Sequence, residues 1–416
     1  MFHLNVTRAQ AEDLLAREGL TWRSESWYEE GSPFPVKVVV AGLPEGANLE
    51  EAIARLRQSE LVASAGLNGI AQPGVLYPAE FARLWGVSAL DTMKAVTSSP
   101  RGFSQTGGTV VVVSASGYWD ALSASALAGL VDAPVLMTAA DSLSSQTADE
   151  LARLNPSRVI VVGGELSVSP AVFDRIAAKF PAVVRVAGTT AAQTAEKVAE
   201  NALALNGSWS DTAFVATSAS YHDALSIASY AYAKRSPLFF TDADGALSDT
   251  TLAAIRAHGF SHVYILGGNM SVPASVETQL GTLFAGRLSG QNGVDTSAAI
   301  AAWGLAHGMN RICVGVASAE AWQDALCGAA VCGKHSSVLL LASDGNLQAI
   351  DRVVPRGYTQ CSCMGYIFGG NLSVSDKVQS YLDNLKNQSS YDPWDPGATP
   401  GNPMLATLEK GGREAV

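Results

Sequence analysis

Hydrophobic residues along this chain gather in short continuous runs that alternate with longer mixed segments. Runs such as Val110–Val113 and Val159–Val162 contain no polar residue, which is typical of strands buried on both faces of a sheet. The segments between such runs have the length and spacing of helices. This alternation predicts α/β units in which βαβ crossovers build a parallel sheet.

The same pattern occurs three times at a spacing of 102 residues. Each copy opens with Arg-[Leu/Val]-x-Gly and has a Thr six residues after the Gly. A helix, a strand, a second helix, a second strand, a third helix and a third strand are expected to follow. The three openings begin at Arg83, Arg185 and Arg287, and the threonines are Thr92, Thr194 and Thr296.

Six strands are predicted from the apolar runs of the three copies. The first of each copy covers Thr109–Ser114, Ala213–Thr217 and Ile312–Ser318, and the second covers Pro134–Thr138, Pro237–Thr241 and Val338–Ala342.

Two further motifs follow predicted strands in every copy. The first reads aromatic-x-Asp-Ala-Leu, and the second reads Gly-Gly-x-[Leu/Met]-Ser-Val. Ligands bind outside the carboxyl ends of the strands in open parallel sheets, so both motifs fall where a binding site is expected. The residues are Tyr118, Tyr221 and Trp322; Asp120, Asp223 and Asp324; and the pairs Gly163-Gly164, Gly267-Gly268 and Gly369-Gly370.

Each of these positions has a structural explanation beside the functional one. An Asp at a helix start caps free N–H groups, and a glycine pair permits a positive φ or a close approach. The aromatic residues either stack on a sugar ring or pack over the neighbouring repeat. His222 has no histidine at the equivalent positions, so Ser123 and Ser226 are interpreted as helix or turn hydroxyls rather than nucleophiles.

These motifs, in this order, resemble the cell wall binding repeat 2 family over residues 83–386. That family occurs as tandem threes in surface proteins of Gram-positive bacteria, including S-layer-associated proteins. The resemblance implies three Rossmann- or Toprim-like domains around a pseudo-threefold axis. It also implies non-covalent binding of an anionic cell-wall polysaccharide in grooves between the units. The motif residues above are our candidate ligand contacts, and no cofactor is expected.

Family members usually carry an Arg between the Gly and the Thr of the opening motif. Ala89, Ala191 and Gly293 stand there in this chain. The expected domains are therefore three wall-binding repeats in which the opening arginines are the remaining cations at repeated positions. Their bounds are 77–184, 185–286 and 287–386.

The segments outside the repeats have other patterns. Residues 1–76 predict a small ferredoxin-like α+β domain, with helices over Val6–Glu18 and Leu49–Arg57 and strands over Val36–Val40 and Val62–Ala71. Its last residues, 60–68, are similar to the close of subtilisin-type propeptides, which implies a prodomain or inhibitor-like module; a structural spacer is the alternative. Residues 387–416, rich in Pro, Gly, Asp and Asn, predict a linker or disordered tail.

Composition narrows the function. A net charge of −11 argues against a nucleic-acid partner, and the lack of a run of 18 apolar, uncharged residues argues against a membrane span. The first residues show no basic-then-apolar pattern of an export leader. All five cysteines lie in the third repeat, where a Cys313–Cys363 disulfide is the favoured pairing and a zinc site is not expected.

We therefore expect a non-enzymatic module that holds a secreted protein at the cell surface. A catalytic or adhesive domain of the same protein outside this chain is compatible with that role. Two alternatives stay open: an S-layer or adhesin scaffold without a glycan ligand, and a hydrolase on a Rossmann-like sheet. The second lacks a Gly-x-Gly-x-x-Gly motif after the first strand of any copy.

Overall fold

A computed structural model describes residues 7–27, 37–42, 52, 55–56, 59, 81–205, 207–356 and 364–387. The chain divides into two compact units, Met1–Pro78 and Ala79–Val416. The second, called the repeat unit below, contains the three repeats.

The N-terminal unit has a helix and an antiparallel strand pair among its described residues. Helix α1 (Arg8–Arg17) and strand β2 (Lys37–Gly42) confirm two predicted elements. Strand β1 (Thr21–Trp27), which pairs with β2, was not predicted, because its polar residues hide the apolar pattern. The expected strand at 62–71 and the propeptide-like close lie outside the described residues.

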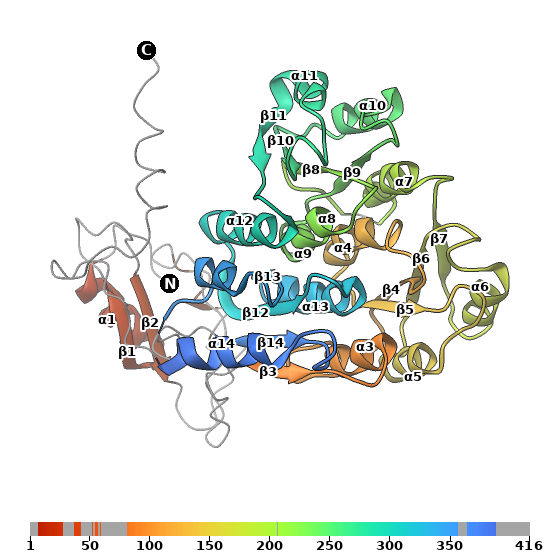
Figure 1. The fold of residues 1–416 in the computed structure, drawn as a ribbon. Helices are drawn as coiled ribbons and strands as arrows, with labels where there is room; N and C mark the ends of the chain where they lie inside the picture. Colours follow the sequence, from red (N-terminus) through yellow and green to blue (C-terminus); the bar gives the residue numbers. More distant parts are fainter. Residues whose placement is uncertain are drawn as a thin grey trace, which may run out of the picture. The chain divides into compact units, whose positions relative to one another are not determined.

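The repeat unit contains three parallel sheets of four strands each, which confirms the predicted fold class (Figure 1). The first sheet has the order β5-β4-β6-β7, with β4 (Thr109–Ser114), β5 (Val135–Thr138), β6 (Arg158–Val162) and β7 (Val183–Val186). The second has the order β9-β8-β10-β11, with β8 (Thr212–Thr217), β9 (Leu238–Thr241), β10 (His262–Leu266) and β11 (Phe284–Leu288). The third has the order β13-β12-β14-β3, with β12 (Asn310–Ser318), β13 (Ser337–Ala342), β14 (Gly365–Phe368) and β3 (Phe81–Leu84).

All six strands predicted for the repeats are present, and their ends differ from the prediction by no more than two residues. The apolar runs locate them well because both faces are covered. In β4, for example, Val110–Val113 are buried.

Helices cover the sheets and connect their strands. The first repeat has α3 (Ala89–Thr97), α4 (Ala121–Leu130), α5 (Ser145–Leu154) and α6 (Pro170–Ala177). The second has α7 (Ala191–Ala204), α8 (His222–Ser226), α9 (Ala228–Lys234), α10 (Asp249–Ala257), α11 (Ser275–Leu280) and the 3-10 turn η1 (Gly281–Leu283). The third has α12 (Gly293–Ala306), α13 (Trp322–Lys334), η2 (Leu347–Arg352) and α14 (Asp376–Asn387).

The opening strand of each repeat pairs with the sheet of the preceding repeat. β7 joins the first sheet, β11 joins the second, and β3 from the start of the first repeat completes the third. The helix after each opening strand packs on its own repeat: α3 contacts β5, α7 contacts β9 and α12 contacts β13. The three sheets are therefore linked in a closed ring, which gives the pseudo-threefold arrangement.

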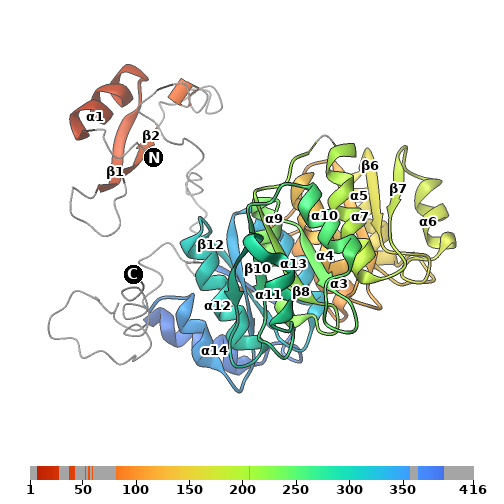
Figure 2. The same cartoon turned by 90° about the horizontal axis from the view of Figure 1, so that it is seen from above.

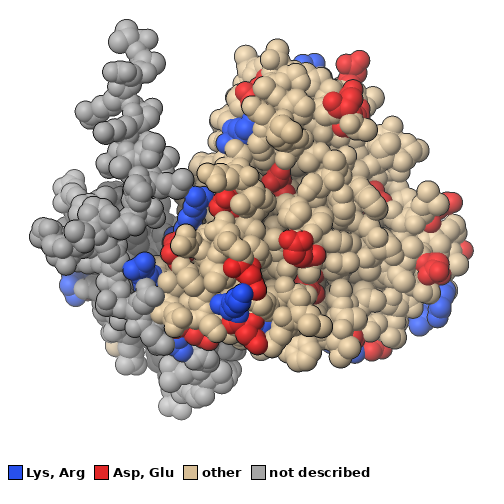
Figure 3. Space-filling model, viewed as in Figure 1, with Lys and Arg blue, Asp and Glu red and all other residues tan. Residues whose placement is uncertain are grey.

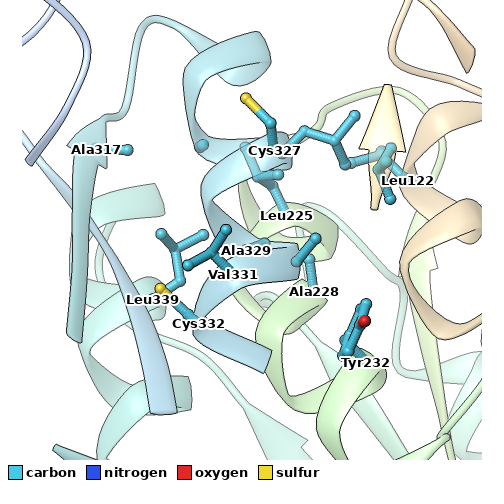
Figure 4. Close-up of a cluster of buried hydrophobic side chains, with 14 of the residues drawn as sticks. Leu122, Leu225, Ala228, Tyr232, Ala317, Cys327, Ala329, Val331, Cys332 and Leu339 are labelled. Carbon is cyan, nitrogen blue, oxygen red and sulfur yellow. The ribbon is translucent and has the colours of Figure 1, made fainter. Parts of the chain in front are cut away.

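Helices α4, α9 and α13 contact one another in the middle of the repeat unit (Figures 1 and 2). They approach closely because small residues face the contacts: a Cβ on Gly129 would lie 2.0 Å from the carbonyl oxygen of Tyr232. Figure 4 shows the packing, in which Leu122, Leu225 and Ala329 from the three repeats share one buried cluster. This apolar core holds the repeats as one body and fixes the positions of the strand ends.

A candidate binding face at the carboxyl ends of the strands

The motifs of each repeat meet at the carboxyl edge of a sheet, meaning the edge where its parallel strands end. In the third sheet, β12 leads to Asp324, β14 leads to Gly369, and the neighbouring β3 leads to Gly86. Residues far apart in the sequence thus line one edge, and the same edge is built three times.

The motif aspartates bind the glycine turn of their own repeat. Oδ2 of Asp324 accepts a hydrogen bond of 3.0 Å from the Ser373 hydroxyl, and Asp120 accepts one from Ser167. Asp120 is the N-cap residue of α4 and makes no side-chain cap hydrogen bond, so the predicted capping role is wrong for Asp120. Asp223 and Asp324 lie in the first turns of α8 and α13, and their role at the helix start stays a prediction.

Two of the aspartates lie in a strongly desolvated position. Burial raises the pKa of Asp223 and of Asp324, and the Ser271 and Ser373 hydroxyls act in the opposite direction. The hydroxyls of Thr296 and Thr92, from the next opening motif in the ring, also lower these pKa values. Oδ1 of Asp324 is buried without a hydrogen-bond partner among the described residues. Asp223 and Asp324 therefore sit between neighbouring repeats.

The repeated threonines hold the turns that open each repeat. The amide of Gly86 donates to Oγ1 of Thr92 at 3.1 Å, and the corresponding bonds of the other copies are 3.0 and 2.9 Å. The sequence spacing of six residues therefore reflects a turn closed by a side-chain acceptor.

The opening arginines donate hydrogen bonds to the backbone of the glycine turns. Nη1 of Arg83 donates to the carbonyl oxygens of Gly369 and Val374, both at 2.9 Å. Nη1 of Arg287 donates to Gly267 at 2.8 Å and Val272 at 2.9 Å, and Arg185 donates to Gly163 at 2.7 Å. Their guanidinium groups thus stabilise carbonyl groups of the protein, and a direct contact of these arginines with a ligand stays a prediction.

The two glycines of each pair have different roles. Gly163, Gly267 and Gly369 have φ values of 121°, 93° and 113°, and a Cβ on any of them would lie within 2.8 Å of the motif carboxylate. A Cβ on Gly164 would lie 3.7 Å from the nearest atom, the carbonyl oxygen of Gly188, and one on Gly268 would have no atom within 4 Å. The first glycine is therefore required by the turn. The second leaves open space at the edge in the first two repeats.

The motif aromatics meet at the centre of the repeat unit. The ring centroid of Tyr118 lies 5.3 Å from that of Tyr221 and 6.4 Å from that of Trp322. The hydroxyl of Tyr118 donates to the carbonyl of Ala219, and that of Tyr221 donates to Ala319, each in the next repeat. These contacts fit the packing alternative, and sugar stacking by the three rings stays a prediction.

The family model for cell wall binding domain 2 (CWB2) matches residues 83–173, 185–277 and 287–379, which are the three repeats. The chain belongs to the CWB2 family. The opening motif of each copy marks the start of each CWB2 match, and the structure shows that the strand in it serves the preceding sheet.

Two curated relatives come from Bacillus subtilis (strain 168). The N-acetylmuramoyl-L-alanine amidase LytC is 30% identical over 285 residues, which cover 67% of this chain and 54% of LytC. The protein named Amidase enhancer is 29% identical over 276 residues, which cover 66% of this chain and 36% of that protein. The chain therefore spans about half of the first relative and about a third of the second.

Solved structures support the fold. Cwp6 from Clostridium difficile aligns with a TM-score of 0.64 at 20% identity, over 79% of this chain and 51% of that one. Cwp8 from the same organism aligns with a TM-score of 0.63 at 18% identity, over 94% of this chain and 67% of Cwp8.

The position at which the family resemblance leads us to expect an arginine lies beside the aspartate loop. A Cβ on Gly293 would lie 3.0 Å from the side chain of His222, which precedes Asp223. Ala89 and Ala191 are likewise the first residues of α3 and α7. The side of the repeat unit seen in Figure 3 is mostly uncharged, with Lys and Arg in small scattered groups.

Sequence reasoning missed a set of exposed apolar residues at the carboxyl edges. Eight large hydrophobic side chains of the described residues are exposed, and six follow strands at these edges. Leu166, Met270 and Leu372, the second variable residue of each glycine motif, are fully exposed. The sequence does contain a signal for these residues, because an apolar residue stands at the same turn position in all three copies. The others are Trp85, Val87 and Trp119.

Three described cysteines, Cys313, Cys327 and Cys332, are buried thiols. The predicted pairing of Cys313 with Cys363 involves a residue outside the described part of the chain. Over the described ranges, no cluster of His, Cys, Asp or Glu has the composition of a metal site, and no helix is long and apolar enough to cross a membrane.

Proposed function

We propose that the three repeats hold this chain non-covalently on a bacterial cell wall by binding an anionic wall polysaccharide. One observation carries the proposal: the same carboxyl edge occurs three times on one body, each time with a fully exposed Leu or Met that packs against nothing in the fold. Folding gains nothing from such a side chain in water, so its threefold presence points to an external contact.

The repetition itself favours attachment. Three similar sites on one body bind a long polymer with an avidity well above the affinity of each site. The names of both curated relatives refer to an amidase, one of them acting on N-acetylmuramoyl-L-alanine. A shared module that keeps such proteins, and this one, at the wall accounts for the common region and implies a secreted, surface-attached protein.

The contact chemistry we infer relies on hydrogen bonds and apolar contacts more than on ion pairs. The three opening arginines donate to backbone carbonyls, and Ala89, Ala191 and Gly293 supply no charge. The anionic character of the polymer rests on the resemblance to the family.

We further infer that the repeats bind without catalysis. The hydroxyl of Ser123 donates to the backbone carbonyl of Asp120, and that of Ser226 donates to the carbonyl of His222, so both are engaged as helix hydroxyls. Neither hydroxyl is activated by a neighbouring base in this arrangement.

Sedimentation with protein-free walls of the producing bacterium tests the proposal. The full chain should sediment with the walls. A variant with Leu166→Ser, Met270→Ser and Leu372→Ser should bind the walls with about tenfold lower affinity. The matched control carries Val184→Ser and Ile312→Ser, which remove exposed apolar groups away from the carboxyl edges. The proposal is contradicted if the native chain does not bind the walls. It is also contradicted if the chain does not bind walls but assembles into ordered arrays without them.

A further inference from the structure

An exposed tryptophan lies beside the glycine turn at the carboxyl edge of the third sheet. The first edge also carries an exposed tryptophan, Trp119, but its ring packs on Tyr118 in the aspartate loop, with 4.8 Å between the ring centroids. Trp85 follows β3 and is 56% exposed, whereas Ala187 and Ser289 occupy the equivalent positions of the other sheets. Its ring lies against the second glycine of the pair, since a Cβ on Gly370 would lie 3.3 Å from Cε3 of Trp85. The glycine thus leaves room for the indole at the edge.

The residues around the indole combine apolar and hydrogen-bonding groups. Leu372, two positions after Gly370, and Val87, two positions after Trp85, are fully exposed. Asn371 between Gly370 and Leu372 is also exposed. One edge thus presents a flat ring, branched apolar side chains and an amide with both a donor and an acceptor.

This combination matches a sugar ring. A pyranose has C–H faces that stack on an aromatic surface and hydroxyl groups around its rim that an amide binds. A protein partner would require a far larger buried area, of about 800 Å² on this side, than a few side chains provide. The chemistry therefore favours a saccharide over a protein surface.

We propose that Trp85, Asn371 and Leu372 form a saccharide subsite in which Trp85 stacks on a sugar of the wall polysaccharide. This subsite makes the third edge the strongest of the three. The inference rests on the proposed function, because it names the contacts through which one of the three edges binds.

The subsite also depends on ring closure. Trp85 belongs to the first repeat, and Gly370 and Leu372 belong to the third. They come together because β3 pairs with β14, in a register that places Leu84 opposite Phe368. The strongest edge is thus assembled from the two ends of the repeat array, and it exists only when the three sheets are linked in a ring.

The test measures apparent affinity of the full chain for protein-free walls, titrated in a sedimentation assay. Trp85→Ala should weaken binding about tenfold, and Trp85→Phe, which keeps a ring, should recover most of the loss. Leu372→Ala should weaken binding more than Leu166→Ala, the same substitution at the equivalent, equally exposed position of the first edge. Thermal unfolding should be unchanged in all four variants.

The outcomes separate this inference from the function on which it rests. If the native chain binds walls and Trp85→Ala binds equally well, the subsite is refuted while the proposed function stands. Equal losses for Leu372→Ala and Leu166→Ala refute the dominance of the third edge. Failure of the native chain to bind walls refutes the proposed function, and that result requires none of the variants.

Discussion

The glycine pair of the second repeat allows a sharp test of how the carboxyl edge is built. Gly267 has a φ of 93°, and a Cβ there would lie 2.1 Å from Oδ2 of Asp223. Gly268, the next residue, has no atom within 4 Å of a Cβ. Alanine at these two adjacent positions therefore meets opposite environments.

The cost of Gly267→Ala has two parts. A non-glycine residue at this φ costs about 1–2 kcal/mol. The clash forces Asp223 out of its buried position beside Ser271, and a disturbed buried polar group costs roughly 1–3 kcal/mol more. We expect the free energy of unfolding to fall by about 3 kcal/mol for Gly267→Ala and by less than about 0.5 kcal/mol for Gly268→Ala.

Urea unfolding followed by tryptophan fluorescence measures both values, since the midpoint shifts with the free energy of unfolding. Gly164→Ala, also in open space, serves as a second control. Equal midpoints for Gly267→Ala and the native chain, or an equal loss at Gly268, would show that the carboxylate does not occupy the place described.

Three further predictions concern the same edge. Arg287→Ala should lower the free energy of unfolding by about 2 kcal/mol, more than Glu277→Ala does. The reason is that Nη1 of Arg287 donates to two backbone carbonyls, whereas Glu277 only forms an ion pair with Arg287; the midpoints of urea unfolding measure both effects. The pKa values of Asp223 and Asp324 are raised from 3.8 in the folded protein, so the stability that these groups contribute is full below pH 3.8 and is lost as the pH rises through their folded pKa values. The double Asp→Asn variant should lack this loss, which is measured by comparing the free energy of unfolding of the two proteins as a function of pH. Raising NaCl from 0.1 to 1 M should weaken wall binding less than tenfold, because the opening arginines bind carbonyls; a steep loss in the sedimentation assay would instead require exposed cations as the main contacts.

Much of the fold follows from local patterns. The buried run Val110–Val113 identified β4 to the residue, because a strand covered on both faces must be apolar throughout. β1 was missed because its sequence, Thr21–Trp27, alternates in no simple way and contains charged residues. The positions of both strand-end motifs were also predictable, since parallel strands present their carboxyl ends at one edge.

The partners of the motif residues were not predictable to the same degree. Asp120 lies at a helix start, and a local rule assigned it to capping, but its carboxylate accepts from Ser167 across the turn. Leu166 and its equivalents had no expected role, because exposure is a property of the folded surface. The sequence showed only that an apolar residue recurs at this turn position, without a reason for it.

The sequence by itself determined the three repeats, their strands and the turns that require glycine, because each depends on residues close together in the chain. The tertiary structure alone decided that β3 completes the third sheet, that Arg83 binds the carbonyl of Gly369 and that Trp85 lies beside Gly370. These contacts join residues more than 280 positions apart. No local pattern specifies such a contact, because it arises only when the packed central helices close the three sheets into a ring.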